Sequence, residues 1–297
     1  MSLSGFPISY AEISRLTPRG ACRHAVLTAL AGLQSARGAT PQHLRRPRVH
    51  FIYFHHCYPD EVESFRALLS ALSRDHELVG YSEAVRRIQV GEFNRPCVAI
   101  SFDDGVKNTL LAAEVMREFG VKGCFFVCPT IVGETDPETL RSFCQARLNF
   151  SPTEFLSWKN LERLLAEGHE VGGHTMTHAR MSATPASELA EETGGCFQEL
   201  QRRVGPVRHF AWPFGRFSDL SAVAAEAVFK AGFETCASAE RGCHVAQHSG
   251  ALHQLCLRRE TLLGAWPLAH SLYLLARSSS RAGLADNHWP EALVPRN

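Results

Sequence analysis

Two adjacent carboxylates, Asp103 and Asp104, are followed directly by Gly105. The apolar run over 98–100 is typical of a buried strand, and a helical pattern follows over 106–119. Parallel α/β folds place their chemistry at the carboxyl ends of such strands. Neighbouring carboxylates repel each other unless a cation neutralises them. One could therefore bind a metal while the other holds or moves a proton, although Asp-Asp-Gly is also a good turn sequence.

Two histidines four residues apart, His174 and His178, form the second candidate group. This spacing places both side chains on one face of an extended or a helical segment. Two imidazoles and one carboxylate suit Zn²⁺ and leave positions open for water and substrate. The glycines Gly172 and Gly173 indicate a tight loop just before them. Taken alone, the spacing is more typical of surface or capping histidines.

Two further groups also stand where strands are predicted to end. The stretch over 211–215 reads Ala-Trp-Pro-Phe-Gly and is by itself a plausible structural turn. His55 and His56 follow a predicted strand over 49–54. Because adjacent strand residues point to opposite faces, we expect at most one of these histidines to face a barrel interior.

Apolar patterns predict strands that alternate with helices, which implies parallel βα units. The predicted strands are 49–54, 97–102, 123–128, 169–174, 209–212, 233–237 and 255–259. The predicted helices are 21–34, 61–72, 82–88, 106–119, 158–167, 186–204, 219–231 and 262–277. The irregular segment 131–157 is predicted to be an insertion with a short helix that covers a binding site.

Composition restricts the class of protein. The 297 residues are 45% hydrophobic and 21% charged, as in ordinary globular proteins, and the net charge of +1 argues against a nucleic-acid partner. Ten cysteines without a Cys-x-x-Cys pair favour a reducing compartment over a disulfide framework. Apolar runs are too short for a transmembrane segment. We expect a cytoplasmic protein and leave open a peripheral position at the inner face of the membrane.

Together the four groups resemble the polysaccharide deacetylases, carbohydrate esterase family 4 with its NodB-homology domain, over about 49–259. Ser101-Phe-Asp-Asp-Gly105 is similar to the family motif Thr-Phe-Asp-Asp-Gly. The stretch over 168–178 resembles the family motif Gly-His-Glu-Ile-(Gly/Ala)-x-His-(Ser/Thr)-x-x-His. The stretch over 210–215 resembles the variant Phe-Ala-Tyr-Pro-Phe-Gly, as in poly-N-acetylglucosamine deacetylases.

The resemblance implies an α/β fold, an incomplete, distorted (β/α)7-type barrel. We expect a catalytic domain over 49–297 that follows an N-terminal arm and linker over 1–48. By the same resemblance, Asp104, His174 and His178 would hold one divalent metal ion, with Zn²⁺ expected.

Asp103 would be the general base that takes a proton from water. The family's third motif usually begins with an Arg that pairs with this Asp, and Ala211 stands there instead. Arg259 is expected to replace that Arg from another direction. The late His that usually acts as the general acid is not visible. Because the poly-N-acetylglucosamine deacetylases place it in an early Tyr-His stretch, we choose His55 over His56.

We therefore predict a metal-dependent hydrolase that removes the N-acetyl group of an amino sugar in a small molecule, glycolipid or polysaccharide. Trp212, Pro213, Phe214 and His56 are expected at the substrate, although core packing explains Trp212 and Phe214 equally well. One alternative is a deformylase or other linear-amide hydrolase on the same fold. A non-catalytic carbohydrate-binding relic is another, and Ala211 favours it.

Overall fold

Nine parallel strands form one sheet in the computed structural model, which describes residues 5–14 and 17–295. Their order is β8-β7-β6-β5-β4-β3-β1-β9, and β2 pairs with β3. The strands are β1 Arg48–Phe54, β2 Glu77–Val79, β3 Pro96–Phe102, β4 Gly123–Val127, β5 Glu170–Gly173, β6 His209–Ala211, β7 Thr235–Ala237, β8 Cys256–Leu257 and β9 Arg259–Thr261.

The sheet curves until its two ends are linked by one segment. Only Arg258 separates β8, which pairs with β7, from β9, which pairs with β1. If 256–261 is counted as one broken strand and β2, which lies off the main path, is left out, seven strand positions surround a common core and nearly close it. This arrangement confirms the predicted incomplete, distorted (β/α)7-type barrel.

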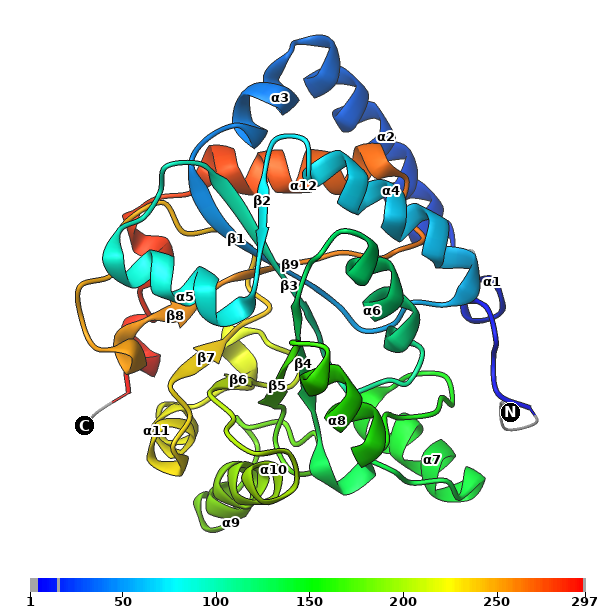
Figure 1. Cartoon of the computed structure of the whole chain (residues 1–297), viewed down its shortest axis with the longest axis vertical. Helices are drawn as coiled ribbons and strands as arrows, with labels where there is room; N and C mark the ends of the chain where they lie inside the picture. The colour runs from blue at the N-terminus through cyan, green and yellow to red at the C-terminus, as the bar shows by residue number, and fades with distance from the viewer. Residues whose placement is uncertain (1–4, 15–16, 296–297) are drawn as a thin grey trace.

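Helices cover the outside of the barrel (Figure 1). They are α1 Tyr10–Ile13, α2 Pro18–Ala36, α3 Ala39–Leu44, α4 Val62–Leu72, α5 Tyr81–Val90, α6 Thr109–Glu118, α7 Pro137–Phe143, α8 Trp158–Ala166, α9 Ala186–Ala190, α10 Cys196–Val204, α11 Ala222–Ala231 and α12 Leu268–Arg281. Two π-helical segments, Cys144–Leu148 and Glu191–Gly195, follow α7 and α9. Within the ranges 5–14 and 17–295, no helix has both the length and the hydropathy to cross a membrane.

The alternation of side chains along β1 and β3 decides which residues reach the barrel interior. Both strands are buried over their whole length. Phe51 and Ala99 pack inside the barrel, whereas Ile52 belongs to the layer between the strands and the helices. Because side chains alternate along a strand, Tyr53 and Asp103 continue the interior row toward the carboxyl ends of β1 and β3.

Each predicted strand overlaps a strand of the structure, and the last is split into β8 and β9. The prediction missed β2, whose three residues are only partly buried and carry a weak apolar signal. It also missed α3 within the expected arm and linker over 1–48, where residues 39–44 form a helix that packs on α12. The proposed division of the chain at residue 48 stays a prediction.

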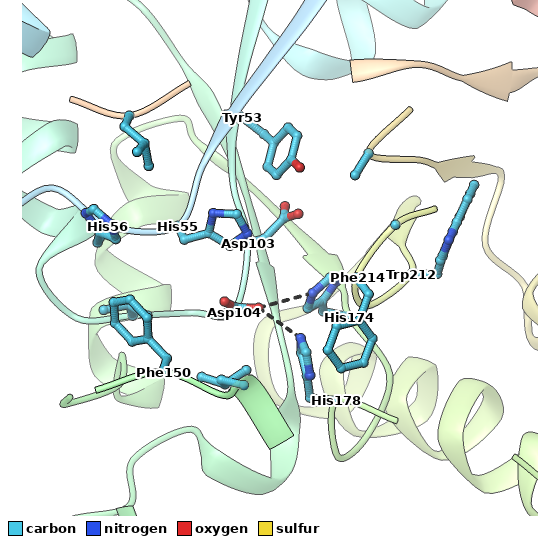
Figure 2. Close-up of a pocket in the computed structure, with 15 residues that line it drawn as sticks. Tyr53, His55, His56, Asp103, Asp104, Phe150, His174, His178, Trp212 and Phe214 are labelled. Atoms are coloured by element: carbon cyan, nitrogen blue, oxygen red, sulfur yellow. Dashed lines mark ion pairs between the residues drawn. The ribbon is translucent and has the colours of Figure 1, made fainter. Parts of the chain in front are cut away.

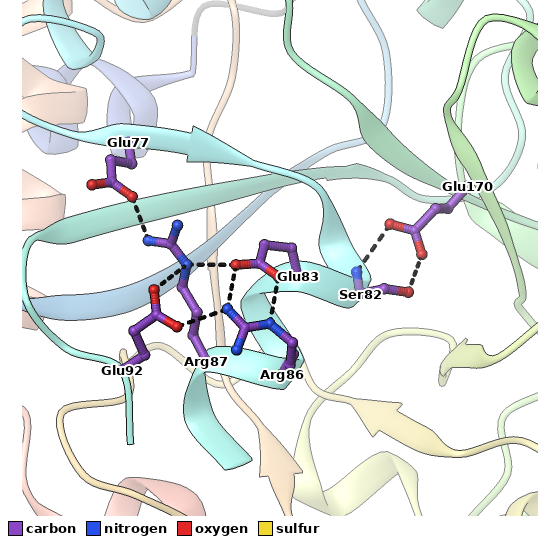
Figure 3. Close-up of polar contacts among 7 residues, drawn as sticks. All are labelled: Glu77, Ser82, Glu83, Arg86, Arg87, Glu92 and Glu170. Atoms are coloured by element: carbon purple, nitrogen blue, oxygen red, sulfur yellow. Dashed lines mark hydrogen bonds and ion pairs between the residues drawn. The ribbon is translucent and has the colours of Figure 1, made fainter. Parts of the chain in front are cut away.

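A polar network at the amino end of the barrel joins α5 to two strands (Figure 3). Arg87 of α5 pairs with Glu77 of β2, and the Ser82 N–H donates to Oε1 of Glu170 over 2.9 Å. Burial alone would raise the pKa of Glu170, but the hydrogen bonds from His209 and Ser82 bring it to about 2. The network thereby fixes the start of β5, the strand that leads into His174.

The ten cysteine thiols are all free, and only Cys22 is exposed. The other nine are buried, and several pack among the apolar residues of the barrel as small hydrophobic side chains. Burial raises the pKa of Cys57 and of Cys256 to about 12. Because the thiolate is the reactive form, these buried cysteines are poor nucleophiles.

Close backbone packing at β5 gives a testable prediction. A Cβ atom on Gly172 would lie 2.5 Å from the ring of Phe126 and 2.7 Å from the carbonyl oxygen of His209. We expect Gly172→Ala to lower the free energy of unfolding by about 3 kcal/mol, because overpacked cores force the backbone to move. Urea denaturation followed by circular dichroism measures this change.

Gly32→Ala is the matched control, since a Cβ there would meet no atom within 4 Å. Gly32 lies within α2, so alanine should stabilise the protein by up to about 1 kcal/mol through helix propensity. Equal stabilities of Gly172→Ala and the wild type would contradict the packing described for β5.

Candidate active site

Asp104, His174 and His178 bring three ligand atoms together at the carboxyl end of the barrel (Figure 2). Asp104 follows β3 and His174 follows β5 directly. Oδ1 of Asp104 lies 3.2 Å from Nε2 of His174 and 3.2 Å from Nε2 of His178. One potential ligand atom from each of the three residues lies within 4.8 Å of the others. The sequence motifs that were 70 residues apart therefore meet at one point.

The hydrogen bonds of the two imidazoles determine which ring nitrogen of each histidine carries the proton. Nδ1 of His174 lies 2.6 Å from the carbonyl oxygen of Ala211, and Nδ1 of His178 lies 3.0 Å from that of Arg147. A carbonyl oxygen can only accept, so each Nδ1 must carry the proton. In the neutral tautomer each Nε2 then presents a lone pair to the Asp104 carboxylate. Three acceptors that face one another need a cation between them, as in a metal site whose outer partners orient the ligands.

Electrostatics keeps the carboxylate of this group ionised. Burial alone would raise the pKa of Asp104, but hydrogen bonds from His174 and His178, in the form in which both Nε2 atoms carry a proton, hold it well below its usual range. An ionised carboxylate with two imidazole nitrogens is a donor set suited to a divalent ion such as Zn²⁺. The residues present therefore fit a metal ion.

Asp103, the other carboxylate of the pair, is clamped by Arg259 of β9. The guanidinium donates from Nη1 to Oδ1 and from Nη2 to Oδ2, both over 2.8 Å, and its Nε donates to the carbonyl oxygen of Ser238. It also lies 4.3 Å from the ring centre of Tyr53. Although burial opposes the shift, Asp103 raises the pKa of Arg259 above its usual value. The bidentate pair fixes the orientation of Asp103.

All five non-glycine residues with positive φ in the described chain lie in or beside the segments that form the site. They are Asp104, Asn149, Thr175, His178 and Phe214, with φ between 49° and 69°. This backbone region is unfavourable for residues with a Cβ, and for a β-branched residue such as Thr175 it is a genuine outlier. Such strain is typical of functional sites that the surrounding structure holds in place.

A pocket of about 260 Å³ opens above the metal-binding group and contains both candidate histidines. Figure 2 shows His55 beside the two carboxylates and His56 farther out, near Phe150. The Nδ1 of His56 lies 2.7 Å from Oε2 of the buried Glu61. The expectation that the two histidines point to opposite faces was wrong, because β1 ends at Phe54 and alternation stops there.

The sequence model of the polysaccharide deacetylase family matches residues 90–235, which contain both carboxylates and both metal-binding histidines. Over these residues, which are just under half of the chain, the sequence is similar to the polysaccharide deacetylase family. It is 30% identical to a chitooligosaccharide deacetylase of Bradyrhizobium sp. (strain ANU 289) over 149 residues, which are 48% of this chain and 58% of that protein. It is 28% identical to one of Sinorhizobium fredii over 129 residues, 42% of this chain and 49% of that protein. The chain thus matches about half the length of these relatives.

Solved structures show the same fold. IcaB from Ammonifex degensii superposes with a TM-score of 0.61 at 19% identity over 77% of this chain and 97% of that one. The Streptococcus pyogenes deacetylase PplD, solved in complex with acetate, also gives 0.61, at 15% identity over 77% of this chain and 99% of that one. At these identities the likeness shows the barrel fold alone.

Ala211 and Arg259 show how this chain departs from the third motif of the family that it resembles. Ala211 ends β6 with its side chain buried, and only its carbonyl oxygen serves the site, as the partner of His174. Arg259 approaches Asp103 from β9. The structure thus places an arginine beside the first carboxylate, although it comes from a different strand of the barrel.

The residues expected at the substrate occupy different positions. Phe214 is exposed at the rim, 5.0 Å from the ring of His178, with the Arg180 guanidinium 3.9 Å from its ring centre. Trp212 lines the pocket but is fully buried, stacks on Trp289 and donates to a backbone carbonyl, so core packing explains most of its contacts. Pro213 is not among the residues that line the pocket.

The pocket residues that the sequence analysis did not predict include Tyr53, Phe150 and Leu263. Tyr53 was open to prediction, because it shares the interior side of β1 with Phe51 and its ring lies 5.3 Å from that of His55. Phe150 comes from the predicted insertion over 131–157 and Leu263 from the segment after β9. Neither segment has a periodic pattern that would indicate its path over the site.

The facing acceptors generate a prediction about metal binding. His174→Ala and His178→Ala should each lose bound Zn²⁺, because each removes one of three ligands. Equilibrium dialysis against Zn²⁺ followed by elemental analysis measures the occupancy. His288→Ala is the control, since that side chain is exposed and outside the site. Full occupancy in either site variant, with circular dichroism like that of the wild type, would disprove the assignment.

Proposed function

We propose that the chain is a metal-dependent deacetylase that hydrolyses the N-acetyl group of an amino sugar. The observation that carries this proposal is the joint geometry of the two carboxylates. Asp104 faces two imidazole acceptors, and Asp103 beside it is held by Arg259. A metal site next to an oriented base is the arrangement that amide hydrolysis by activated water needs.

Asp104, His174 and His178 would hold the ion, and we propose Zn²⁺. When bound, such an ion supplies a Lewis acid that polarises the acetyl carbonyl and makes water more acidic. The outer hydrogen bonds to Ala211 and Arg147 keep the imidazoles oriented. Both acceptors are backbone carbonyl oxygens, so the orientation of the imidazoles does not depend on another side chain.

Asp103 would act as the general base. Each of its carboxylate oxygens accepts one hydrogen bond from Arg259, which leaves a second lone pair on each oxygen for a water molecule. Arg259 remains cationic and keeps both carboxylate oxygens in place. The left-handed backbone at Phe214 turns this segment toward the site, and a backbone N–H near it would donate to the developing oxyanion.

His55 would be the general acid that gives its proton to the leaving amine. Burial lowers the pKa of His55, while the carboxylates of Asp104 and Asp103 oppose this shift. The imidazole lies on the pocket side of these carboxylates (Figure 2). His56, held by Glu61, would instead form part of the wall that contacts the sugar.

The proposed substrate class is an N-acetylated amino sugar in a small molecule, a glycolipid or a polysaccharide. The curated relatives that the chain matches are named as chitooligosaccharide deacetylases. A deformylase would use the same residues, and acetate against formate release distinguishes the two. The binding relic was favoured only because Ala211 stands where the motif has an arginine. Arg259 pairs with Asp103 instead, which argues against the relic. We also propose a cytoplasmic location.

The first activity test uses the purified protein with Zn²⁺ and N-acetylated chitooligosaccharides. Acetate release should require the metal and stop when a chelator removes it. Asp103→Asn should retain the metal, since Asp104 is untouched, yet lose turnover by about a hundredfold or more.

Failure of the wild type on every acetylated and formylated amino sugar, despite full metal occupancy, would disprove the proposed function. Wild-type rates in Asp103→Asn would show that Asp103 is only a turn residue.

A second activity test separates the two pocket histidines. An amine leaves poorly without a proton, whereas a phenolate leaves unaided. His55→Ala should therefore slow amide substrates far more than activated acetate esters. His56→Ala is the control, and it should change both substrate types by a similar factor. Equal losses on both types in His55→Ala would show that His55 does not donate the proton.

A further inference from the structure

Helix α2 carries apolar side chains on a face that nothing in the described chain covers. One side of this helix packs on α3 and α12, with Ala31 buried and Leu27 against the core. Figure 1 shows α2 and α3 as an outer layer beyond α12. On the other side Val26, Leu30 and Leu33 are 50%, 40% and 50% exposed.

Together with Cys22, these residues form a continuous strip, here called the α2 stripe (Cys22, Val26, Leu30 and Leu33). The spacings of four, four and three residues place them on one face of a helix. At 1.5 Å per residue the stripe is about 17 Å long. Soluble proteins normally scatter exposed apolar residues singly, so a contiguous row indicates an interaction surface.

The charged side chains of α2 and of its carboxyl-terminal cap are all positive. Arg19 and Arg23 lie at its amino end and Arg37 at its carboxyl end. Residues 13–59 contain seven arginines and neither Asp nor Glu, although the whole chain has a net charge of only +1. Across the described ranges, none of these three arginines pairs with a carboxylate; Arg23 lies over the ring of Trp266 at 4.9 Å.

We propose that the α2 stripe docks on an anionic lipid surface. A helix with an apolar face and arginines beside it lies in the interface of a membrane, and its cations attract anionic headgroups. A second copy of the chain fits less well. The exposed face of α2 offers no carboxylate to a symmetric partner, so the arginines of two copies would face each other.

Docking would also place the active site near the lipid surface. The first half of α2 lines a cavity of about 550 Å³ together with Leu263 and Trp266. Leu263 lines the active-site pocket as well. The docked helix would thus lie beside a cavity that shares Leu263 with the pocket. The surface itself rests on the exposure and charge of α2 and does not depend on the proposed activity.

Cys22 provides a direct probe, because it is the one exposed thiol and belongs to the stripe. The full chain labelled there with nitrobenzoxadiazole is mixed with vesicles of phosphatidylglycerol and phosphatidylcholine in equal parts. Its emission should shift to the blue, and vesicles of phosphatidylcholine alone should give little shift. The control is Cys22→Ser/Val223→Cys, which carries the label on exposed Val223 of α11 and should show no shift.

A matched pair of variants tests the apolar part. Val26→Gln/Leu33→Gln changes two stripe residues that are each 50% exposed, and Val90→Gln/Val223→Gln changes two that are each 54% exposed elsewhere. The stripe variant should cosediment with the mixed vesicles at least tenfold more weakly, because two apolar side chains no longer enter the interface. The control should bind like the wild type. All four positions are exposed, so circular dichroism should be unchanged.

The charge is tested with Arg19→Gln/Arg23→Gln/Arg37→Gln, which should weaken binding about a hundredfold. Equal binding of the wild type to both kinds of vesicle would overturn the proposal. So would stripe and control variants that bind alike. A wild-type dimer in sedimentation velocity that the stripe variant dissociates would assign the surface to a second copy instead.

Discussion

Two backbone carbonyl groups decide the chemistry of this barrel. The carbonyl oxygens of Ala211 and Arg147 take the Nδ1 protons of His174 and His178, so both Nε2 lone pairs point at the Asp104 carboxylate. Such a cluster is unstable without a cation, because each acceptor repels the others. The requirement is built into the main chain of β6 and of the insertion before α8, and it does not rely on any additional charged side chain.

The second carboxylate depends on the same end of the barrel in another way. Asp103 receives its arginine from β9, and β9 exists as a separate strand because the chain breaks at Arg258 between two pairings. The segment that nearly closes the sheet therefore also supplies the partner of the proposed base. Closure of the barrel and orientation of Asp103 therefore both depend on β9. A change that loosened β9 would disturb both.

The sequence was sufficient for the parallel α/β barrel and for the meeting of Asp104 with His174 and His178, since strand periodicity and motif spacing are local properties. Tyr53 was not predicted, although alternation along β1 could have placed it in the barrel interior. By contrast, the relation of His55 to His56 depended on where β1 ends, which burial and pairing decide. Phe150 and Leu263 lie on aperiodic segments whose path is set by tertiary contacts. The exposed side of α2 was hidden for a similar reason, because composition does not tell which face of a helix is packed.

The left-handed residues at the site have a thermodynamic consequence. Each non-glycine residue in that conformation costs on the order of 1–3 kcal/mol, and Asp104, Asn149, Thr175, His178 and Phe214 are concentrated at one end of the molecule. The buried strands and helices must supply the free energy that holds them. Amide hydrogen exchange would then be fastest in the loops after β3, β5 and β6, while the strands themselves stay protected. The stability of the barrel therefore offsets the backbone strain at the carboxyl ends of its strands.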